Sequence, residues 1–220
     1  MTPTPAEMAE ALYRLGCAPW EIGAAQPILR RLVALNAVRG RVLDPGCGTG
    51  HHSIMYAQAG CTVTGIDAAP SAIRRARKNA RNAGVAVDFQ HGNVTTVLDG
   101  YDEAQFDVVV DSKLYDNLEP SARRRYAAGL RHVLKPGGRL YLYGFASGTS
   151  VNAFHNHEPV EIDYENELLS AGFEITYSGP ATYLLNSEHW LPICPRCPRQ
   201  SPGDQMHIPI AEVHARAPKE

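Results

Sequence analysis

The stretch Val42-Leu43-Asp44-Pro45-Gly46-Cys47-Gly48-Thr49-Gly50 decides the fold of this chain. Its first residues form a short apolar run that ends in an acid, which is typical of a buried parallel strand. Three glycines at alternate positions then require a tight turn, and residues 50–59 have a helical pattern. A strand, a glycine-rich turn and a helix N-terminus form a surface where backbone N–H groups face a ligand closely. The spacing is G-x-G-x-G, so it is neither the dinucleotide fingerprint nor a Walker loop.

Two acidic residues end neighbouring predicted strands. Asp44 precedes the glycine turn and can accept hydrogen bonds from a cationic ligand, which argues against a pyrophosphate there. A second buried-strand pattern covers residues 61–67 and ends at Asp67, 19 residues beyond Gly48. An acid at the tip of the second strand is placed to accept both hydroxyls of a ribose.

The chain resembles the class I S-adenosylmethionine-dependent methyltransferases in four stretches: VLDPGCGTGHHS, VTGIDAAPSAIRRARKNA, FDVVVDSKLYDNL and LRHVLKPGGRLYLYGF. They follow the order and spacing of that family's motifs over about residues 40–145. The resemblance implies a three-layer, doubly wound α/β fold with a mostly parallel, seven-stranded sheet and an N-terminal helical cap. It also implies S-adenosyl-L-methionine as the cofactor.

The resemblance assigns cofactor binding to the N-terminal segment, the glycine turn and the ends of the first four strands. The residues expected there are Trp20, Gln26, Asp44, Gly46, Gly48, Thr49, His51, Asp67, Ala68, Asn93, Val94 and Asp111. Asn93 departs from the family pattern, in which an acid accepts a hydrogen bond from the adenine amino group and the next backbone N–H meets the ring. The Asn93 amide oxygen can still accept that bond, but without a charge the contact is weaker.

The N-terminal segment carries a further resemblance. Residues 19–27, PWEIGAAQP, resemble a stretch of a bacterial group that includes heterocyclic-toxin and thiopurine-like methyltransferases. This implies that Trp20 and Gln26 line the cofactor site and that Tyr13 lies over the sulfonium. The alternative for Trp20 is to pin the N-terminal helix to the core, and an indole can do both.

The pattern of apolar residues predicts the remaining elements. An amphipathic helix is expected over residues 5–15, with Met8, Leu12 and Leu15 on one stripe. Further helices are expected over residues 27–38, 50–59, 72–82, 121–134 and 161–170, and strands over 86–90, 106–110, 139–144 and 173–177. The latter half of residues 206–215 is expected to form the last strand, antiparallel and next to strand 139–144.

Bulk properties limit the organisation and the partners. With 220 residues, 44% of them hydrophobic, the chain can bury one sizeable core. Together with the resemblance, this implies one methyltransferase domain: a helical cap over the cofactor (1–39), a cofactor-binding core (40–145), and substrate-side loops with the last strands (146–220). A formal net charge of −2 gives no global field that attracts nucleic acid or an anionic membrane. The basic residues of helix 72–82 and of 123–125 are interpreted as solvated helix faces. Without a long apolar run or signal peptide, the protein is expected to be soluble and cytoplasmic.

The cysteines do not indicate a disulfide framework. There are five, an odd number, and Cys47 and Cys61 fall in predicted core elements. Cys194 and Cys197 form a C-x-x-C pair, whose alternatives are a zinc site, a redox dithiol, or incidental thiols on a loop that covers the substrate. One pair cannot complete a four-ligand site, and we assign no metal.

The acceptor side is expected where strands 106–110 and 139–144 end. Residues 111–117 face the pocket, because ligands of open α/β sheets bind beyond the carboxyl ends of strands. This loop lacks the Asn-Pro-Pro-aromatic stretch of amino-methylating DNA enzymes, and a similar loop in the related bacterial group touches the methionine part of the cofactor. His155 and His157, in the long loop 145–159, are the candidates for a general base, with two exposed histidines as the alternative. Tyr13 is the third catalytic candidate.

The predicted function is methyl transfer from S-adenosylmethionine to O, N or S of a small aromatic or heterocyclic metabolite, in natural-product tailoring or detoxification. A base is unnecessary if the acceptor is already ionised, which is the favoured case. A protein or RNA methyltransferase with a partner subunit and a non-catalytic cofactor-binding module are the alternatives. The chain is expected to act as a monomer or homodimer, on a small molecule, and without contact to nucleic acid or membrane.

Overall fold

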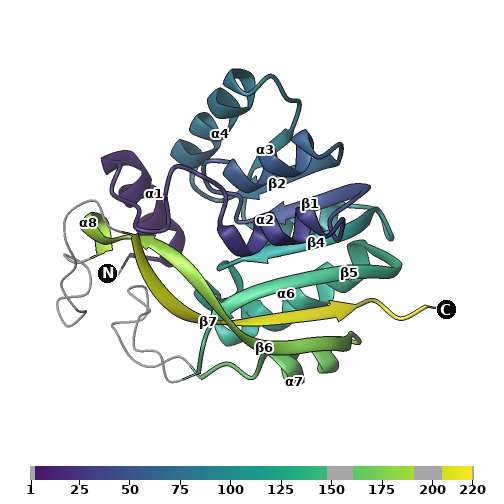
Figure 1. Ribbon diagram of the computed structural model, residues 1–220. Helices are drawn as coiled ribbons and strands as arrows, with labels where there is room; N and C mark the ends of the chain where they lie inside the picture. The colour runs from purple at the N-terminus through teal and green to yellow at the C-terminus, as the bar shows by residue number, and fades with distance from the viewer. Residues whose placement is uncertain (1–2, 148–160, 191–204, 220) are drawn as a thin grey trace.

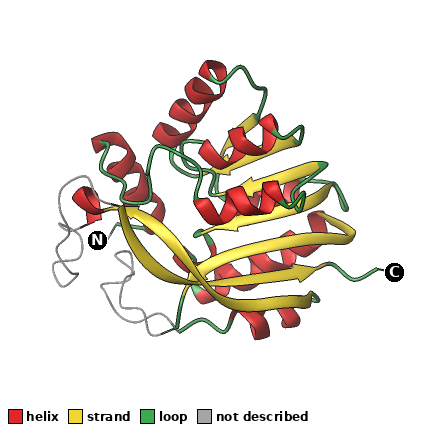
Figure 2. Cartoon of the chain, in the orientation of Figure 1, coloured by secondary structure: helices red, strands yellow, loops and turns green. Residues whose placement is uncertain are grey.

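The computed structural model describes residues 3–147, 161–190 and 205–219, which form a seven-stranded sheet with helices on both faces (Figures 1 and 2). The strand order is β3-β2-β1-β4-β5-β7-β6, and β7 pairs antiparallel with both of its neighbours. The expected three-layer, mostly parallel fold is therefore confirmed, including the place of the last strand beside β5. No helix of the described residues is long and apolar enough to cross a membrane.

The elements are bounded as follows. The strands are β1 Arg41–Pro45, β2 Thr62–Asp67, β3 Asp88–His91, β4 Phe106–Ser112, β5 Leu134–Phe145, β6 Glu174–Asn186 and β7 Gln205–Arg216. The helices are α1 Pro5–Leu15, α2 Pro27–Ala34, α3 His51–Gln58, α4 Pro70–Asn82, α5 Val94–Val97, α6 Pro120–Val133, α7 Tyr164–Ser170 and α8 Ser187–Trp190, with single 3-10 turns η1 Leu98–Gly100 and η2 Tyr115–Asn117.

Separate hydrophobic clusters fill the two faces of the sheet. One joins β4, β5 and β7 to helices α5, α6 and α7, with Leu130 and Leu168 fully buried. The other face packs against α2 and α3, where Leu29 and Tyr56 are fully buried. A smaller cluster joins α3 and α4 around Phe89. Because apolar contacts hold both faces, the carboxyl ends of the parallel strands are held on a rigid frame.

Helix α1 has well-defined ends but a different buried face from the one predicted. Thr4 and Glu7 form a capping box at its start, and Gly16 ends it in the left-handed conformation. The face toward the core is centred on Tyr13, which is buried and packs in a cluster with Ala9 and Leu12. Leu15 lies two residues beyond Tyr13, about 200° around the helix, and is 78% exposed. The predicted stripe through Leu15 is therefore wrong.

Strands β6 and β7 are longer than predicted. Ser178, Gly179 and Pro180 are typical turn residues, which is why the sequence indicated a strand end at residue 177. In the structure the ladder continues through them, with Pro180 opposite Ala211, and reaches Asn186 opposite Gln205. Proline is tolerated here because β6 is the edge strand of the sheet.

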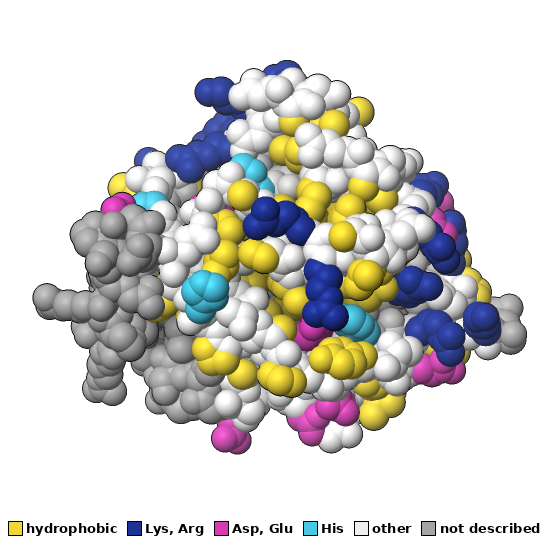
Figure 3. Space-filling model, in the orientation of Figure 1, with side chains coloured by type: hydrophobic (Ala, Val, Ile, Leu, Met, Phe, Trp, Pro, Cys, Tyr) yellow, Lys and Arg dark blue, Asp and Glu magenta, His cyan; other side chains and the backbone are white. Residues whose placement is uncertain are grey.

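The two basic runs differ in role. The Lys and Arg side chains of α4 are exposed and gather at the upper left of the molecule in Figure 3, as predicted for a solvated face. On α6, Arg123 departs from that prediction. Its guanidinium donates to both carboxylate oxygens of Glu167, the Nη2–Oε1 distance being 3.0 Å, and to the carbonyl of Leu118. Arg123 therefore ties α6 to α7.

Candidate functional site

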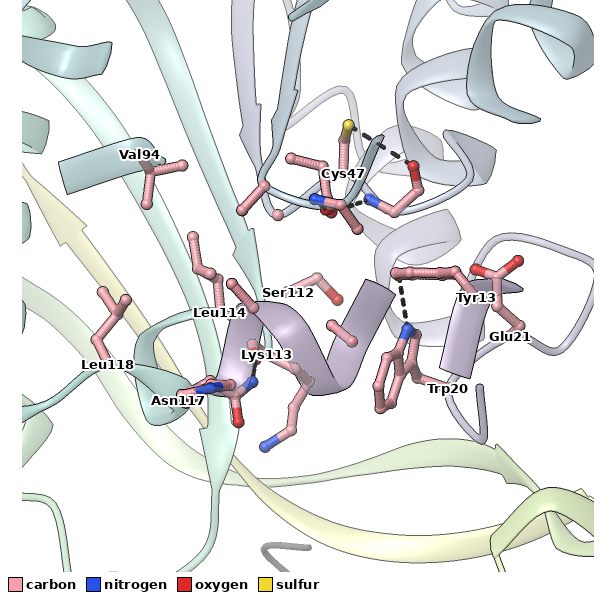
Figure 4. Close-up of a pocket in the computed structure, with 18 of the residues that line it drawn as sticks. Tyr13, Trp20, Glu21, Cys47, Val94, Ser112, Lys113, Leu114, Asn117 and Leu118 are labelled. Carbon is pink, nitrogen blue, oxygen red and sulfur yellow. Dashed lines mark hydrogen bonds between the residues drawn. The ribbon is translucent and has the colours of Figure 1, made fainter. Parts of the chain in front are cut away.

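A cavity of about 410 Å³ lies at the carboxyl ends of the parallel strands and is covered by α1 (Figure 4). Its volume is in the range of small-molecule sites. One part of its wall comes from the glycine turn and the ends of β2 and β3, the other from β4 to β7. The lining residues used below are Tyr13, Trp20, Glu21, Gly46, Gly48, His51, His52, Asp67, Ala68, Asn93, Val94, Ser112, Lys113, Phe145, Tyr183, Leu185 and Ile208.

The glycine turn after β1 is approached closely by the side chains of Tyr13 and Leu114. Gly46 and Gly48 have φ of 71° and 55°, in the left-handed region that disfavours other residues. A Cβ on Gly48 would lie 2.7 Å from the Tyr13 hydroxyl, and one on Gly46 would lie 3.0 Å from Leu114 Cβ. The absence of a Cβ at these two positions thus allows Tyr13 and Leu114 to pack on the turn, and the contact of its backbone with a ligand stays a prediction.

Asp67 lies at the tip of β2, in the cavity wall, with Ala68 beside it. Its Oδ2 accepts from the Gly48 N–H and its Oδ1 from the Ala69 N–H, both at 2.8 Å. Burial raises the pKa of Asp67 to about 6, although these two hydrogen bonds oppose the shift. Each carboxylate oxygen has a second lone pair, which leaves Asp67 able to accept from a pair of ligand hydroxyls.

Tyr13 and Trp20 form a joined aromatic wall (Figure 4). The Trp20 indole Nε1 donates to the Tyr13 hydroxyl at 2.7 Å, and the rings meet edge to face with centroids 5.8 Å apart. Trp20 also packs against two hydrophobic clusters, so it both lines the cavity and pins α1. Burial raises the pKa of Tyr13 well above its ordinary value, so its hydroxyl stays neutral and is a poor proton acceptor.

Gln26 and Thr49 lie behind the cavity wall and not on it, contrary to the prediction. The Gln26 side chain is 1% exposed, and its amide donates to the Leu184 carbonyl at 2.9 Å and accepts from the Leu184 N–H at 3.0 Å. It therefore extends the hydrogen bonding of β6 as a backbone would. The Thr49 hydroxyl donates to the Glu21 carboxylate.

Asp44 and Asp111 likewise lie behind the wall and accept hydrogen bonds from other parts of the protein. Asp44 accepts from the Ser53 hydroxyl at 2.5 Å. Asp111 accepts from two backbone N–H groups, those of Leu114 and Tyr115, and from the Tyr126 hydroxyl. Burial raises the pKa of both carboxyls to about 7. Their position at strand ends is as predicted, but their side chains shape the turns and do not reach the cavity.

Asn93 lines the cavity, yet its amide oxygen is already used. Oδ1 accepts from the backbone N–H and the hydroxyl of Thr95, at 3.0 and 2.9 Å, and so caps α5. The sequence predicts that this oxygen accepts a hydrogen bond from an adenine amino group. In the structure both of its lone pairs are already used, so it is not free to do so. Val94 and His51 also line the cavity, each as the first residue of a helix.

The sequence prediction did not name several of the residues that line the cavity. Lys113 is in the loop that was expected to face the pocket; its ammonium binds the Asp116 carboxylate and lies 2.9 Å from the centroid of the Phe145 ring. His52 Nε2 accepts from the Gln26 N–H at 3.2 Å, and burial lowers the pKa of His52 to about 3. The Tyr183 hydroxyl lies 3.0 Å from Ser112 Oγ. For Lys113, the signal was its place directly after β4; for Tyr183, no local pattern was available.

The remaining catalytic and metal candidates lie outside the described residues. These are His155, His157, Cys194 and Cys197, whose roles stay predictions. Within the described ranges, no three His, Cys, Asp or Glu side chains are grouped to hold a metal ion, and Cys17, Cys47 and Cys61 are free thiols.

Comparisons with known proteins agree with this geometry. Residues 42–138 match the family described as a methyltransferase domain. A 2-heptyl-1-hydroxyquinolin-4(1H)-one methyltransferase of Mycobacteroides abscessus is 29% identical over 171 residues, which cover 77% of this chain and 74% of the relative. Together with the fold, these matches support a class I methyltransferase.

Solved structures extend the likeness to nearly the whole chain. A protein studied for the conversion of a disulfide bond into a thioacetal group during echinomycin biosynthesis superposes with a TM-score of 0.80 at 25% identity, covering 97% of this chain and 93% of its own. The Burkholderia thailandensis 1,6-didemethyltoxoflavin-N1-methyltransferase, solved with its substrate and S-adenosylhomocysteine, gives 0.65 at 21% identity, covering 100% and 92%. The second likeness supports the fold alone.

Proposed function

We propose that this protein transfers a methyl group from S-adenosylmethionine to O, N or S of a small aromatic or heterocyclic molecule. The observation that carries the proposal is one cavity whose wall joins Asp67, at the tip of β2, to the apolar and aromatic ends of β5, β6 and β7. The first part suits a ribose and the second a flat, apolar acceptor. The relative named as a 2-heptyl-1-hydroxyquinolin-4(1H)-one methyltransferase is consistent with such an acceptor.

The residues of the cofactor part fit S-adenosylmethionine. Gly48 lets the Tyr13 hydroxyl lie directly against the turn, where a Cβ would be 2.7 Å from it. Asp67 is proposed to accept from the two ribose hydroxyls, and Tyr13 with Trp20 to face the sulfonium with aromatic surface, which attracts a cation. Bound there, the cofactor supplies an electrophilic methyl group. The task of the chain is to align the acceptor with it and to exclude water.

The acceptor part of the wall is largely apolar. Phe145, Leu185 and Ile208 come from three neighbouring strands, and Tyr183 adds a hydroxyl that is already bonded to Ser112. His52 is a weak base, because burial lowers its pKa and its Nε2 already accepts a hydrogen bond. The proposed bases His155 and His157 would have to approach this part of the wall. Their alanine variants should lower turnover by about 10²–10⁴-fold if a base is required, and by a few-fold at most if it is not.

Calorimetric titration with S-adenosylhomocysteine tests the cofactor assignment, and a panel of thiols, phenols and N-heterocycles tests methyl transfer. We expect binding, followed by release of S-adenosylhomocysteine from S-adenosylmethionine with some members of the panel. Binding without release from any small molecule, together with methylation of a protein or RNA recovered with the chain, would favour the partner-dependent alternative. A lack of binding in the wild type would contradict the proposal.

A further inference from the structure

Lys113 stands out among the cavity residues because of its charge. It is the one lysine or arginine among the described residues that line the cavity, whereas Glu21, Asp67 and Glu119 are acidic. It follows β4 directly, so its side chain starts at the carboxyl end of a central strand, and in Figure 4 it runs away from Cys47 and the glycine turn. The ammonium meets Phe145, at the acceptor part of the wall. Lys113 therefore lies on the acceptor side.

The backbone of Lys113 is held in an uncommon conformation. Its φ is 74°, in the left-handed region, which disfavours residues other than glycine. Two hydrogen bonds hold it there: its N–H donates to the Tyr143 carbonyl at 3.0 Å, and its carbonyl accepts from Asn117 Nδ2 at 2.6 Å. Strained residues of this kind persist where the surroundings determine them, and they cluster at functional sites.

The ammonium is held by a carboxylate that is itself fixed. Asp116 is fully buried, and besides Lys113 it accepts from the Tyr164 hydroxyl at 2.5 Å and from the Phe145 N–H at 3.0 Å. An ammonium has three donors. One faces Asp116 and the cation also lies over the Phe145 ring, which leaves donor capacity for a ligand in the cavity.

A purely structural role explains these observations poorly. Buried ion pairs are often no more stabilising than apolar residues of the same volume. The backbone of Lys113 is also in the left-handed region, and 12% of the lysine side chain remains exposed beside a cavity. A charge kept at that position is better explained by a ligand that carries the opposite charge.

We infer that Lys113 recognises the negative charge of the methyl acceptor, so that the substrates of this site are acidic O–H or S–H compounds, such as phenols, heteroaromatic hydroxyls or thiols, bound as anions. This inference rests on the proposed function. The acceptor gives its proton to water when it binds beside the ammonium. Its lone pair then forms the bond to the methyl carbon, while the carbon–sulfur bond breaks and its electron pair stays on sulfur. No proton has to be removed in the transfer step, so no base is needed.

The surroundings of the ammonium are consistent with this role. The charged groups that face it are Asp116 and, further away, Asp111, and the titratable group bonded to the same carboxylate is Tyr164. Burial lowers the pKa of Lys113, and the two aspartates oppose that shift. Apolar walls strengthen the attraction between the ammonium and an anion, because less water screens them.

The test compares Lys113→Met with Lys135→Met, a matched control. Lys135 also pairs with an aspartate, Asp107, at 2.6 Å, but lies outside the cavity. The probes are 4-nitrophenol and 4-nitrothiophenol, whose ionisation is visible by absorbance, and 4-nitroaniline as a neutral analogue. With S-adenosylhomocysteine present, the wild type and the control should bind both acidic probes as anions and lower their apparent pKa by about one unit or more.

In Lys113→Met, the affinity for the anions should fall about 10-fold or more, matching a shift of about one unit, while affinity for S-adenosylhomocysteine stays within about 3-fold. With acceptors that turn over, KM should rise for acidic ones and change little for neutral amines. Lys113→Arg should restore part of the anion preference. Equal losses for acidic and neutral probes, or an unshifted probe pKa in the wild type, would overturn the inference.

Two further measurements separate possible failures. Lys113→Met leaves the Asp116 carboxylate buried without its ammonium, so the double variant Lys113→Met/Asp116→Asn, which removes both charges, repeats the binding series. If the wild type does not bind S-adenosylhomocysteine at all, the proposed function fails. If it binds the cofactor and methylates neutral amines in preference to acidic compounds, the proposed function stands and the Lys113 inference is wrong.

Discussion

A carboxylate that is to bind a ribose must stay ionised in a partly buried place, and Asp67 is near that limit. Burial raises its pKa to about 6, and the Gly48 and Ala69 N–H groups oppose the shift. Because ligand hydroxyls donate to the ionised form, we expect the affinity for S-adenosylhomocysteine to fall as the pH drops from 7.5 to 5, through this pKa. Calorimetry across that range measures it.

Asp67→Asn should bind S-adenosylhomocysteine more weakly by about 1–3 kcal/mol at pH 7.5 and should lose most of the pH dependence. Asp102→Asn, which changes an exposed aspartate, should behave as the wild type. An affinity unchanged in Asp67→Asn would remove the ribose assignment.

At Gly48, one contact limits which residue the position can hold. In Gly48→Ala the new Cβ would meet the Tyr13 hydroxyl at 2.7 Å, and the φ of 55° adds strain. We expect weaker S-adenosylhomocysteine binding and a lower melting temperature. In a Tyr13→Phe background the contact is absent, so the loss caused by Gly48→Ala should be smaller; a double-mutant cycle by calorimetry measures the difference. Strictly additive losses would mean that the contact with Tyr13 does not limit residue 48.

At the scale of elements, Gln26 joins the segment before α2 to the edge strand β6. Gln26→Ala leaves the N–H and carbonyl of Leu184 without their partners, and we expect unfolding free energy to fall by about 1–3 kcal/mol in chemical denaturation. Because the side chain lies behind the wall, S-adenosylhomocysteine affinity should stay within a few-fold. A large loss of affinity with unchanged stability would restore the direct cofactor role that the sequence indicated.

The strands and their end residues show where sequence reasoning succeeds and where it fails. Strands β1, β2 and β4 were predictable, because each is a largely buried run with an acid as its last or second-last residue, and the turn after β1 follows from its glycines. The hydrogen-bond partners of polar side chains were not predictable. Asp111 accepts from Tyr126 on α6, and Gln26 bonds to β6, 158 residues away. Side-chain direction at a strand end depends on such distant contacts, which a local pattern does not contain.

The whole molecule places several carboxylates where parallel strands end, and this has a cost in stability that depends on pH. Asp44 lies among Ser53, Asp111 and Asp67, and burial first, then the two other carboxylates, raises its pKa. A Ser53 hydroxyl at 2.5 Å partly offsets the burial. The sheet that aligns the cavity thus also concentrates carboxyl groups beneath it, and the raised pKa values of Asp44 and Asp111 limit the negative charge there near pH 7.

The last prediction follows from the sign of that shift. The pKa of Asp44 is about 7 in the folded protein and about 3.9 in an unfolded chain, so between these values the folded state holds more protons. Stability from this group is therefore present at low pH and is lost as the pH rises from about 4 to about 7. Asp44→Asn has no such loss and keeps an acceptor for the Ser53 hydroxyl. We expect its unfolding free energy, relative to wild type, to increase by about 1–4 kcal/mol between pH 5 and 8, measured by denaturant unfolding at each pH. In Asp102→Asn the curve should run parallel to that of the wild type. Parallel curves for Asp44→Asn as well would mean that Asp44 is ionised throughout, and the charge beneath the cavity would then be larger than its burial indicates.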